Sequence, residues 1–547
     1  MFQGRPFAPL PASPWPLPPA SLAISGRLVA ADWVVLCGYF AVLIAAGLWF
    51  ARKNRGADSK TFFQGGGNAP VWVIAVSFLA TAQSAATVLG APEDAYKGDL
   101  RYLSTNIGGI LAASVLATWF IPAYYRLGVT TPYQLLEHRF GPGAKIAASC
   151  MYMLGRVLAS GARVFVGAVP VAMAIFGTGP GELEASHIGV AIVVFMAFGA
   201  LFTLAGGLSS VIWTDVIQVA VYVGGALAVI YFLWNAVGGD AGTVLRAVEH
   251  GGPDGGSKLR FLSLGWEGPG GFSFKEPFTL ITACSGWLLL LLAAYGTDQD
   301  LVQRLLATEN ARKGSLSIIT GVLAGIPTVL IFAIIGVLLW VYYQRPEVTG
   351  RMAPDYLSGS TGDVFLKFTL HELPGGMAGL VLAGVMAAGP AGINSSLNSM
   401  ASTFVTDLYR PLRPGRADHH YVTVGRWATA GWAIVLCLFA LVCIAWKRAN
   451  NESILDFVLG VMSFAYTGML GVFFTALFTR RGNTISAIAA LIAGVIVVTL
   501  MQPAVLARLL DRPVTEVAFA APWRMVIGTI ITTCIAMLPP GRVPRPG

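Results

Sequence analysis

The sequence is poor in charged residues and lacks the cysteine spacing of a metal site. Only 12% of its 547 residues are Asp, Glu, Lys or Arg, whereas soluble domains contain roughly 25%. The six cysteines include no C-x-x-C pair, which argues against a zinc site and against a disulfide framework. The net charge is +9, but no basic run with interleaved aromatic residues occurs, so we expect no nucleic-acid partner.

Motifs for nucleotide-driven or hydrolytic chemistry are also missing. The 64 glycines form neither a P-loop nor a strand–G-x-G-x-x-G–helix unit, so ATP-driven transport is not expected. There is no H-E-x-x-H motif, no Ser/His/Asp set at a plausible membrane depth, and no T-V-G-Y-G channel filter. We therefore predict that the protein is neither an enzyme nor a channel. We expect no cofactor apart from a coupling ion.

What the sequence does contain is apolar residues, which make up 55% of the chain. A run of about 20 apolar residues is long enough to cross a bilayer. About thirteen such runs occur, and they predict an all-α, polytopic membrane protein. The expected spans are residues 31–51, 70–98, 104–124, 146–175, 188–206, 210–235, 277–297, 314–343, 375–407, 421–446, 454–479, 484–501 and 522–539.

The order of these spans predicts a duplicated core. Five spans lie within residues 70–235 and five within 277–479. An odd number of spans repeated in tandem gives two units of opposite topology. Such inverted repeats, with broken helices at the membrane midplane, are typical of secondary transporters. The remaining parts are a flexible N-terminal lead at 1–29, an extra N-terminal helix at 30–51, an extracellular connecting loop at 236–276 and two C-terminal helices at 484–539.

Basic residues gather in alternate short loops, for example at 52–55, 410–416 and 480–481. Loops rich in Lys and Arg stay in the cytoplasm. We therefore expect the N-terminus outside and the C-terminus inside a cell (plasma or inner) membrane that the chain crosses many times.

Four stretches are too polar or too rich in small residues for helices that face lipid. They are residues 79–90, 209–218 with Asp215, 295–304 and 384–407. The first and the last predict interrupted helices that meet halfway through the bilayer around a hydrated cavity. For the first stretch the alternative is an interior helix whose hydroxyls bond to its own carbonyls, and for the last it is tight helix packing. In 295–304 we expect local ion pairs near one helix end.

Five segments together resemble the sodium:solute symporter family, in family order over about residues 60–480. They are FFQGGGNAPVWVIAVSFLATAQSAATVLGAPEDAYKGD, IPAYYRLGVTTPYQLLEHRFG, GGLSSVIWTDVIQ, TDQDLVQRLLA and SSLNSMASTFVTDLYR. The resemblance implies the LeuT-like fold, with five-plus-five inverted helices and extra helices at both ends. It also implies sodium-driven symport of a small organic solute by alternating access.

In that family a shared sodium site joins carbonyls of the first core helix to a carbonyl and two hydroxyls of the eighth. The matching positions here are Ala80, Gln83, Ala388, Ala391 and Gly392. The two hydroxyl positions hold alanine and glycine, which places sodium coupling through this site in doubt.

The resemblance also implies a second cation site, which some members have. Its positions are Asp215, Asn394 and Ser395, and all three are polar. We therefore expect cation coupling to have shifted toward Asp215. It would carry Na⁺ as the only metal, or H⁺ if desolvation favours the neutral acid.

The pocket side of the first core helix offers Ala82, Ser84 and Thr87, and the sixth adds Trp287, Leu291 and Tyr295. Leu291 and Ala294 replace the Asn and Tyr of sugar-carrying relatives, so the resemblance leans toward members that carry monocarboxylates and vitamins. Arg156 or Arg163 is placed to pair with a substrate carboxylate, or else to hold Asp215 or reach the membrane surface.

The function that we expect is symport of a small organic solute with a monovalent cation, in contact with membrane lipids. The alternative is a proton-coupled or uncoupled carrier that has lost the usual sodium site, which the replaced hydroxyls favour. A solute sensor is disfavoured because no appended signalling segment follows the last span.

Overall fold

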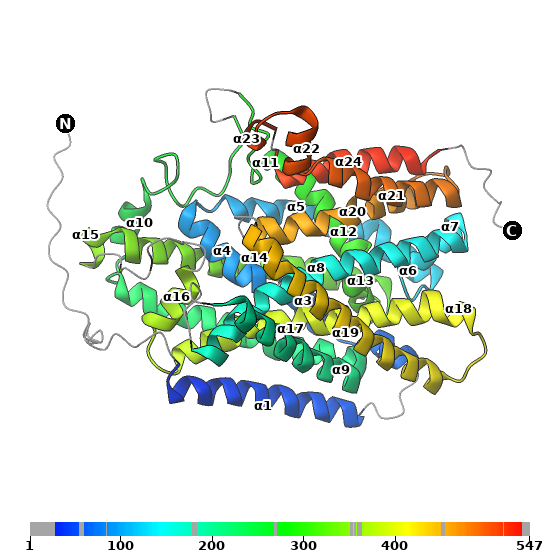
Figure 1. The fold of residues 1–547 in the computed structure, drawn as a ribbon, viewed down its shortest axis with the longest axis horizontal. Coiled ribbons are helices and arrows are strands. Elements are labelled where there is room, and N and C mark those ends of the chain that lie inside the picture. Colours follow the sequence, from blue (N-terminus) through cyan, green and yellow to red (C-terminus); the bar gives the residue numbers. More distant parts are fainter. Residues whose placement is uncertain are drawn as a thin grey trace.

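The regular structure is entirely helical over the part of the chain that the computed structural model describes. That part comprises residues 28–53, 59–83, 85–177, 183–266, 271–350, 354, 357, 364–449, 454–517 and 519–538. Most long helices run along one axis of the molecule (Figure 1). The prediction of an all-α protein is confirmed.

The spans found in the described residues match the expected number. Seven helices are long and apolar enough to cross a membrane, and two further candidates are pairs of helices bent at a short break. Four shorter apolar helices accompany them: Ala185–Leu201, Ser463–Phe478, Thr484–Leu500 and Ala521–Ala536.

The first half of the chain forms the helices up to the long connection. They are α1 (Ala30–Lys53), α2 (Ser59–Gln64), α3 (Val71–Ala82), α4 (Ala85–Lys97), α5 (Thr105–Val115), α6 (Ile121–Leu127), α7 (Tyr133–Phe140), α8 (Pro142–Phe176), α9 (Ala185–Ala236) and α10 (Ala241–Val248). A π-helical turn, Leu116–Phe120, joins α5 to α6.

The second half contains the remaining helices. They are α11 (Leu280–Thr282), α12 (Leu288–Gly296), α13 (Gln299–Leu305), α14 (Ala311–Gln344), α15 (Pro346–Thr349), α16 (Val364–His371), α17 (Met377–Thr403), α18 (Arg410–Leu412), α19 (Asp418–Ala449), α20 (Ile454–Phe478), α21 (Thr484–Leu500), α22 (Pro503–Leu510), α23 (Val514–Val517) and α24 (Ala521–Ala536). Two more π-helical turns are Ala283–Trp287 and Phe404–Tyr409.

Two membrane segments are broken, but only one of them is where the sequence placed it. The first break separates α3 from α4, which are bent by 61°. The second separates Leu280–Gly296 from α13, with a bend of 66°. The expected interruption within 384–407 is wrong, because α17 is one continuous helix over these residues.

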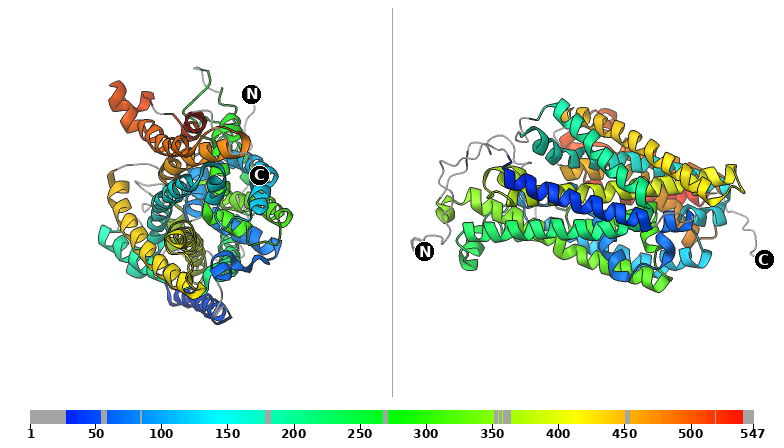
Figure 2. Two further views of the ribbon diagram at one scale, coloured as in Figure 1. Left: turned by 90° about the vertical axis from the view of Figure 1, so that its right-hand side faces the viewer. Right: turned by 90° about the horizontal axis from the view of Figure 1, so that it is seen from below.

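The small residues of α17 serve close packing instead of a break. In the most apolar 18-residue window of Met377–Leu412, 88% of the residues are buried, and the end-on view shows this yellow-green helix inside a ring of others (Figure 2). A side chain at Gly389 would collide with the Phe195 ring, and one at Gly384 would crowd Tyr222. The packing alternative therefore explains Gly384 and Gly389, whereas Gly392 has open space beside it.

The predicted spans 188–206 and 210–235 meet at a sharp turn inside α9. Gly207 has φ 61° and ψ −163°, a backbone conformation essentially restricted to glycine. A Cβ atom there would lie 2.6 Å from the carbonyl oxygen of Phe62. Glycine at this position both permits the turn and admits α2.

The extra N-terminal helix is attached to α17 through one carboxylate. Asp32 of α1 is 2% exposed, and its Oδ1 accepts hydrogen bonds of 2.7 Å from the backbone N–H groups of Gly376 and Gly379. These are among the donors that a helix start leaves without intrahelical partners. Asp32 thus caps α17 from another helix.

The long connection between the two halves is more ordered than the sequence indicated. It contains α10, and Lys258 donates from Nζ to the carbonyl oxygens of Tyr96 (3.0 Å) and Gly98 (2.6 Å). Burial lowers the pKa of this lysine to about 8. The connection is therefore fixed to the end of α4. The short helices α7, α10 and α16 were not predicted.

We predict that Gly207→Ala destabilises the protein by about 1–3 kcal/mol, since alanine strongly disfavours this backbone conformation. Thermal unfolding of the purified protein in detergent measures the effect. Gly224→Ala is the matched control, because Gly224 is in helical conformation with open space beside it. Equal melting temperatures for the two variants would contradict the role given to Gly207.

Candidate functional site

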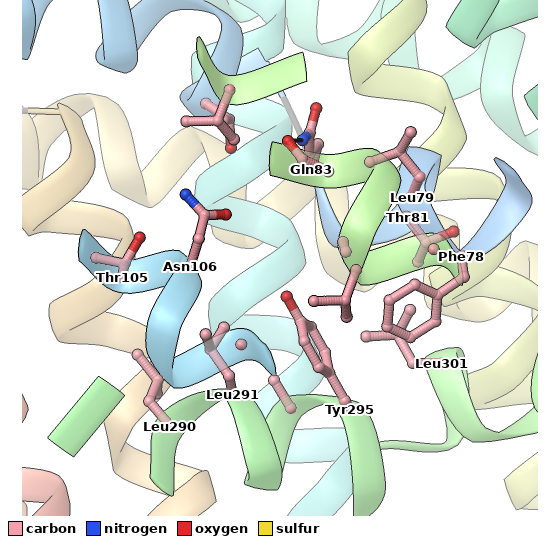
Figure 3. A pocket seen from close by; sticks show the side chains of 18 of the residues that line it. Phe78, Leu79, Thr81, Gln83, Thr105, Asn106, Leu290, Leu291, Tyr295 and Leu301 are labelled. Carbon is pink, nitrogen blue, oxygen red and sulfur yellow. Dashed lines mark hydrogen bonds between the residues drawn. The ribbon is translucent and has the colours of Figure 1, made fainter. Parts of the chain in front are cut away.

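A cavity of about 150 Å³ lies beside the first broken helix. Its apolar wall includes Phe78, Leu79, Trp287, Leu290, Leu291 and Val322, and its polar wall includes Gln83, Thr87, Thr105, Asn106, Arg156, Arg163 and Tyr295. In Figure 3 the side chains of Gln83, Asn106 and Tyr295 approach this space from three different helices. The cavity therefore offers an apolar side together with amide, hydroxyl and guanidinium groups.

The break between α3 and α4 is fixed to a neighbouring helix by a glutamine. Gln83 ends α3 in an extended conformation, with φ −91° and ψ 154°. Its Nε2 donates to the carbonyl oxygen of Gly325 in α14 at 3.3 Å, while its Oε1 has no partner among the described residues. The cavity and the helix break thus share one side chain.

A buried guanidinium connects four helices next to this break. Arg304 of α13 is fully buried. It donates from Nε to the hydroxyl of Ser77 in α3 (2.8 Å) and from a terminal nitrogen to Asp215 Oδ2 in α9 (3.1 Å). It also donates to the hydroxyl of Ser395 in α17 and to the carboxylate of Asp300 (3.2 Å).

The Ser77 hydroxyl completes this arrangement by donating to Asp215 Oδ2 at 2.5 Å. The other carboxylate oxygen, Asp215 Oδ1, is buried and has no hydrogen-bond partner among the described residues. A buried carboxylate oxygen without a donor is unfavourable. This atom therefore has the capacity to bind a cation or a proton.

A second guanidinium, from α8, holds the start of α13. Arg156 is 2% exposed and pairs with Asp300 and, at 3.5 Å, with Asp298. Asp298 caps α13 through the backbone N–H of Asp300 and accepts a hydrogen bond of 2.7 Å from the Tyr466 hydroxyl. Arg156 and the Tyr466 hydroxyl thus both stabilise the second break.

Hydroxyl groups join the same network to α17. Ser396 donates to Asp300 Oδ2 at 3.1 Å and lies 2.8 Å from the Ser160 hydroxyl of α8. Tyr152 donates to Ser399 at 2.6 Å. The two broken segments, α8 and α17 therefore form one polar layer across the molecule.

The sequence model of the sodium:solute symporter family matches residues 62–494, which is most of the chain. The chain belongs to the sodium:solute symporter family.

Individual relatives are similar to this chain over most of its length. A sodium/sialic acid symporter of Proteus mirabilis is 29% identical over 484 residues, covering 85% of this chain and 88% of the relative. A rabbit (Oryctolagus cuniculus) sodium-dependent multivitamin transporter is 27% identical over 545 residues, covering 95% and 78%. A substrate-bound, outward-open structure of a Na⁺-coupled sialic acid symporter has a TM-score of 0.76 at 25% identity, covering 93% of this chain and 97% of that one.

The protein is thus a multi-pass, cation-coupled solute symporter and not an enzyme. The expected family and fold, with broken helices in a LeuT-like arrangement, are confirmed. The assignment of individual residues to sodium and substrate stays a prediction, and the structure shows only where these residues lie.

The positions of the usual sodium site of these symporters are poor in side-chain oxygen. Ala80 and Ala388 are each 1% exposed, and Gly392 is buried with open space where a side chain would be. The side chain of Ala391 lies outside the described residues. The carbonyl oxygen of Gly392 accepts from Ser396 at 2.7 Å.

The positions of the second cation site are only partly brought together. Asp215 and Ser395 share the Arg304 guanidinium. Asn394 has a buried amide oxygen without a partner among the described residues, and its backbone carbonyl accepts from Thr203 at 3.3 Å. From the sequence we expected Arg304 to form only local ion pairs near one helix end. That interpretation is incomplete, because Arg304 also has partners on α3, α9 and α17.

Most of the residues predicted for the substrate pocket line the one cavity. They are Ala82, Thr87, Trp287, Leu291 and Tyr295. Ser84 lies outside the described residues. Arg156 does not hold Asp215, since its carboxylate partners are Asp298 and Asp300.

Sequence reasoning missed Ser77 and Gln303 of this layer. Ser77 lies in an otherwise apolar turn of the first core helix. The signal in the sequence is its position four residues before Thr81, which places both hydroxyls on one helix face. Its hydroxyl is the group that brings Asp215 and Arg304 to the first broken helix.

We predict that Arg156→Met lowers the free energy of unfolding by about 3–5 kcal/mol, because it leaves the buried Asp298 without its cation and Asp300 with Arg304 alone. Thermal unfolding in detergent is the measurement. Lys313→Ala removes an exposed ion pair with Glu309 and is expected to have no measurable effect. Similar melting curves for both variants would show that the Arg156 pairs do not stabilise the fold.

Proposed function

We propose that this symporter carries a small organic carboxylate together with Na⁺, and that Asp215 takes part in the coupling. The observation that carries the proposal is the cavity beside the first helix break, which combines two guanidinium groups with an apolar wall. The N-terminus would lie outside the cell membrane and the C-terminus in the cytoplasm, as the basic loops indicate.

The size of the cavity supports a small substrate. A cavity of about 150 Å³ accommodates a molecule of the size of benzene, and this one has that volume. The names of the relatives include sialic acid and vitamins. A short or aromatic monocarboxylate fits the observed volume better than a sugar acid does.

The distribution of charge supports an anion. Arg156 and Arg163 lie two turns apart on α8, and both line the cavity. Arg156 holds Asp298 and Asp300, and we assign Arg163, which also lines the cavity, to the substrate carboxylate. Trp287 and Leu291 would contact the apolar part of the solute.

The coupling site is supported by the unpartnered oxygen of Asp215. Oxygen ligands suit hard cations. A buried carboxylate with one unpaired oxygen offers Na⁺ a side-chain ligand, whereas the alanine and glycine at the usual sodium positions offer none. Proton coupling is the other outcome that the experiment on Asp215 distinguishes.

We predict that Arg163→Gln raises KM for carboxylate uptake by roughly 10- to 100-fold, as expected for the loss of a charge-assisted hydrogen bond. Uptake into proteoliposomes is measured for a panel of short and aromatic monocarboxylates and their neutral amides. Arg312→Gln, at an exposed arginine of α14, is the matched control. Transport of amides as well as acids by the wild type would exclude carboxylate recognition.

We predict that Asp215→Asn reduces Na⁺-driven uptake at least about tenfold, since a neutral amide binds a cation more weakly than a carboxylate does. Uptake is compared under imposed Na⁺ and H⁺ gradients. Asp511→Asn is the control, because Asp511 is exposed at a φ of 50°, which asparagine tolerates. Unchanged gradient-driven uptake would remove Asp215 from coupling, and uptake driven by H⁺ alone would identify the proton as the coupling ion.

A further inference from the structure

Polar side chains continue along one face of α17 beyond the residues assigned to coupling. Ser395, Asn398 and Ser402 are spaced i, i+3 and i+7, which places them on the same side of a helix. All three are at most 1% exposed. Ser395 contacts Arg304 and, through it, Asp215. The stripe therefore begins at the proposed coupling site.

The neighbouring helix α13 follows this stripe. Gln303 is next to Arg304, and its Oε1 accepts from Asn398 Nδ2 at 3.4 Å. The Nε2 atom of Gln303 is buried and has no partner among the described residues. The seam between α13 and α17 thus contains a donor without an acceptor.

Ser402 and Thr403 are unusual among the buried hydroxyls of this molecule. Thr81, Thr369 and Thr475 each donate to the carbonyl four residues earlier, which is the common arrangement in helices. The hydroxyls of Ser402 and Thr403 are fully buried and have no partner in the described part of the chain. Such groups are unfavourable unless water or an ion is bound there.

The stripe ends at a second buried carboxylate. The π-helical turn Phe404–Tyr409 follows directly on α17, and Asp407 lies about one turn beyond Ser402 and Thr403. Asp407 is fully buried and accepts hydrogen bonds from Thr131 (2.8 Å) and Ser149 (2.9 Å). No basic side chain of the described residues forms an ion pair with it.

A separate cavity of about 620 Å³ is lined by chain neighbours of Asp407 and of its hydrogen-bond partner Thr131. Thr130 and Thr406 line it, together with Gly66, Gly67 and Arg410. The loops around it carry the basic residues that indicate the cytoplasmic side. None of Ser395, Asn398, Ser402 and Asp407 lines the substrate cavity.

We propose that Asn398, Ser402 and Asp407 line a route by which the coupling cation passes between Asp215 and the cytoplasm, separate from the substrate cavity. The inference rests on the proposed function, since it needs a cation at Asp215. Oxygen atoms from carboxylate, hydroxyl and amide groups at successive turns offer ligands in sequence, and polar residues at membrane depth mark ion pathways. The competing interpretation is that these groups only hold α13 against α17.

The test is chemical labelling of Ser402→Cys in the full-length protein, on a background with the six native cysteines replaced by serine. The small cationic reagent 2-aminoethyl methanethiosulfonate is added from the cytoplasmic face of oriented vesicles. We expect modification in choline medium and about fivefold slower modification when Na⁺ occupies the route at the same ionic strength. Thr406→Cys, in the adjoining cavity, is expected to react in either medium.

The negative control is Thr475→Cys, a buried hydroxyl position of α20 bonded to its own helix, which is expected to stay unmodified. If Ser402→Cys is as inert as this control, or reacts equally with and without Na⁺, the route is wrong and the residues only pack two helices.

A second variant keeps the inference testable if Ser402→Cys does not fold. Asp407→Asn retains shape and one acceptor but removes the charge, and we expect it to slow Na⁺-coupled uptake about tenfold while the external Na⁺ affinity is unchanged. If Asp407→Asn has the turnover and the Na⁺ affinity of the wild type, the route is wrong but the coupling proposal stands. Uptake by the wild type that does not depend on Na⁺ would overturn the coupling proposal and the route with it.

Discussion

The arrangement depends on one guanidinium placed where four helices meet. Arg304 contacts Ser77 of α3, Asp215 of α9 and Ser395 of α17 while it is part of α13. A buried charge is tolerated only when it is paired and hydrogen-bonded, so these partners must stay within reach of one another. Through Ser77 and its own place on α13, Arg304 thereby links the two broken segments to each other.

This constraint explains why a transporter of this kind can have broken helices without losing its shape. Asp298 and Asp300 satisfy the start of α13, and Arg156 neutralises both of them from α8. On the other side, Gln83 anchors the first break to α14 through Gly325. The cavity lies between these two anchored points, so its walls come from helices that are far apart in sequence but fixed relative to one another.

Much of the fold could be predicted from the sequence, because apolar length and charge are local properties. The thirteen apolar runs, the turn at Gly207 and the break at residues 83–84 are all marked by composition. The second break was misplaced because the glycines around residue 390 resemble a helix interruption, yet Gly389 admits the Phe195 ring and α17 stays intact. Composition cannot distinguish a glycine that unwinds a helix from one that receives a neighbour.

The site was harder to predict, because its contacts join residues more than 80 positions apart. Asp300 and Arg304 are four residues apart and form a local pair, as expected, but their partners Arg156, Asp215 and Ser395 come from other helices. The family resemblance supplied Asp215 and Ser395, whereas Ser77 and Ser402 stood out only after their hydrogen bonds, or the lack of them, were visible in three dimensions.

The carboxylate of Asp32 gives the first helix a role that its position outside the duplicated core does not indicate. The two backbone donors that it satisfies belong to the opening turn of α17, the helix around which the others are arranged. A shortened chain that started at the first repeat would leave the N–H groups of that turn without this acceptor. The smallest autonomous unit of this transporter is consequently larger than its symmetric core.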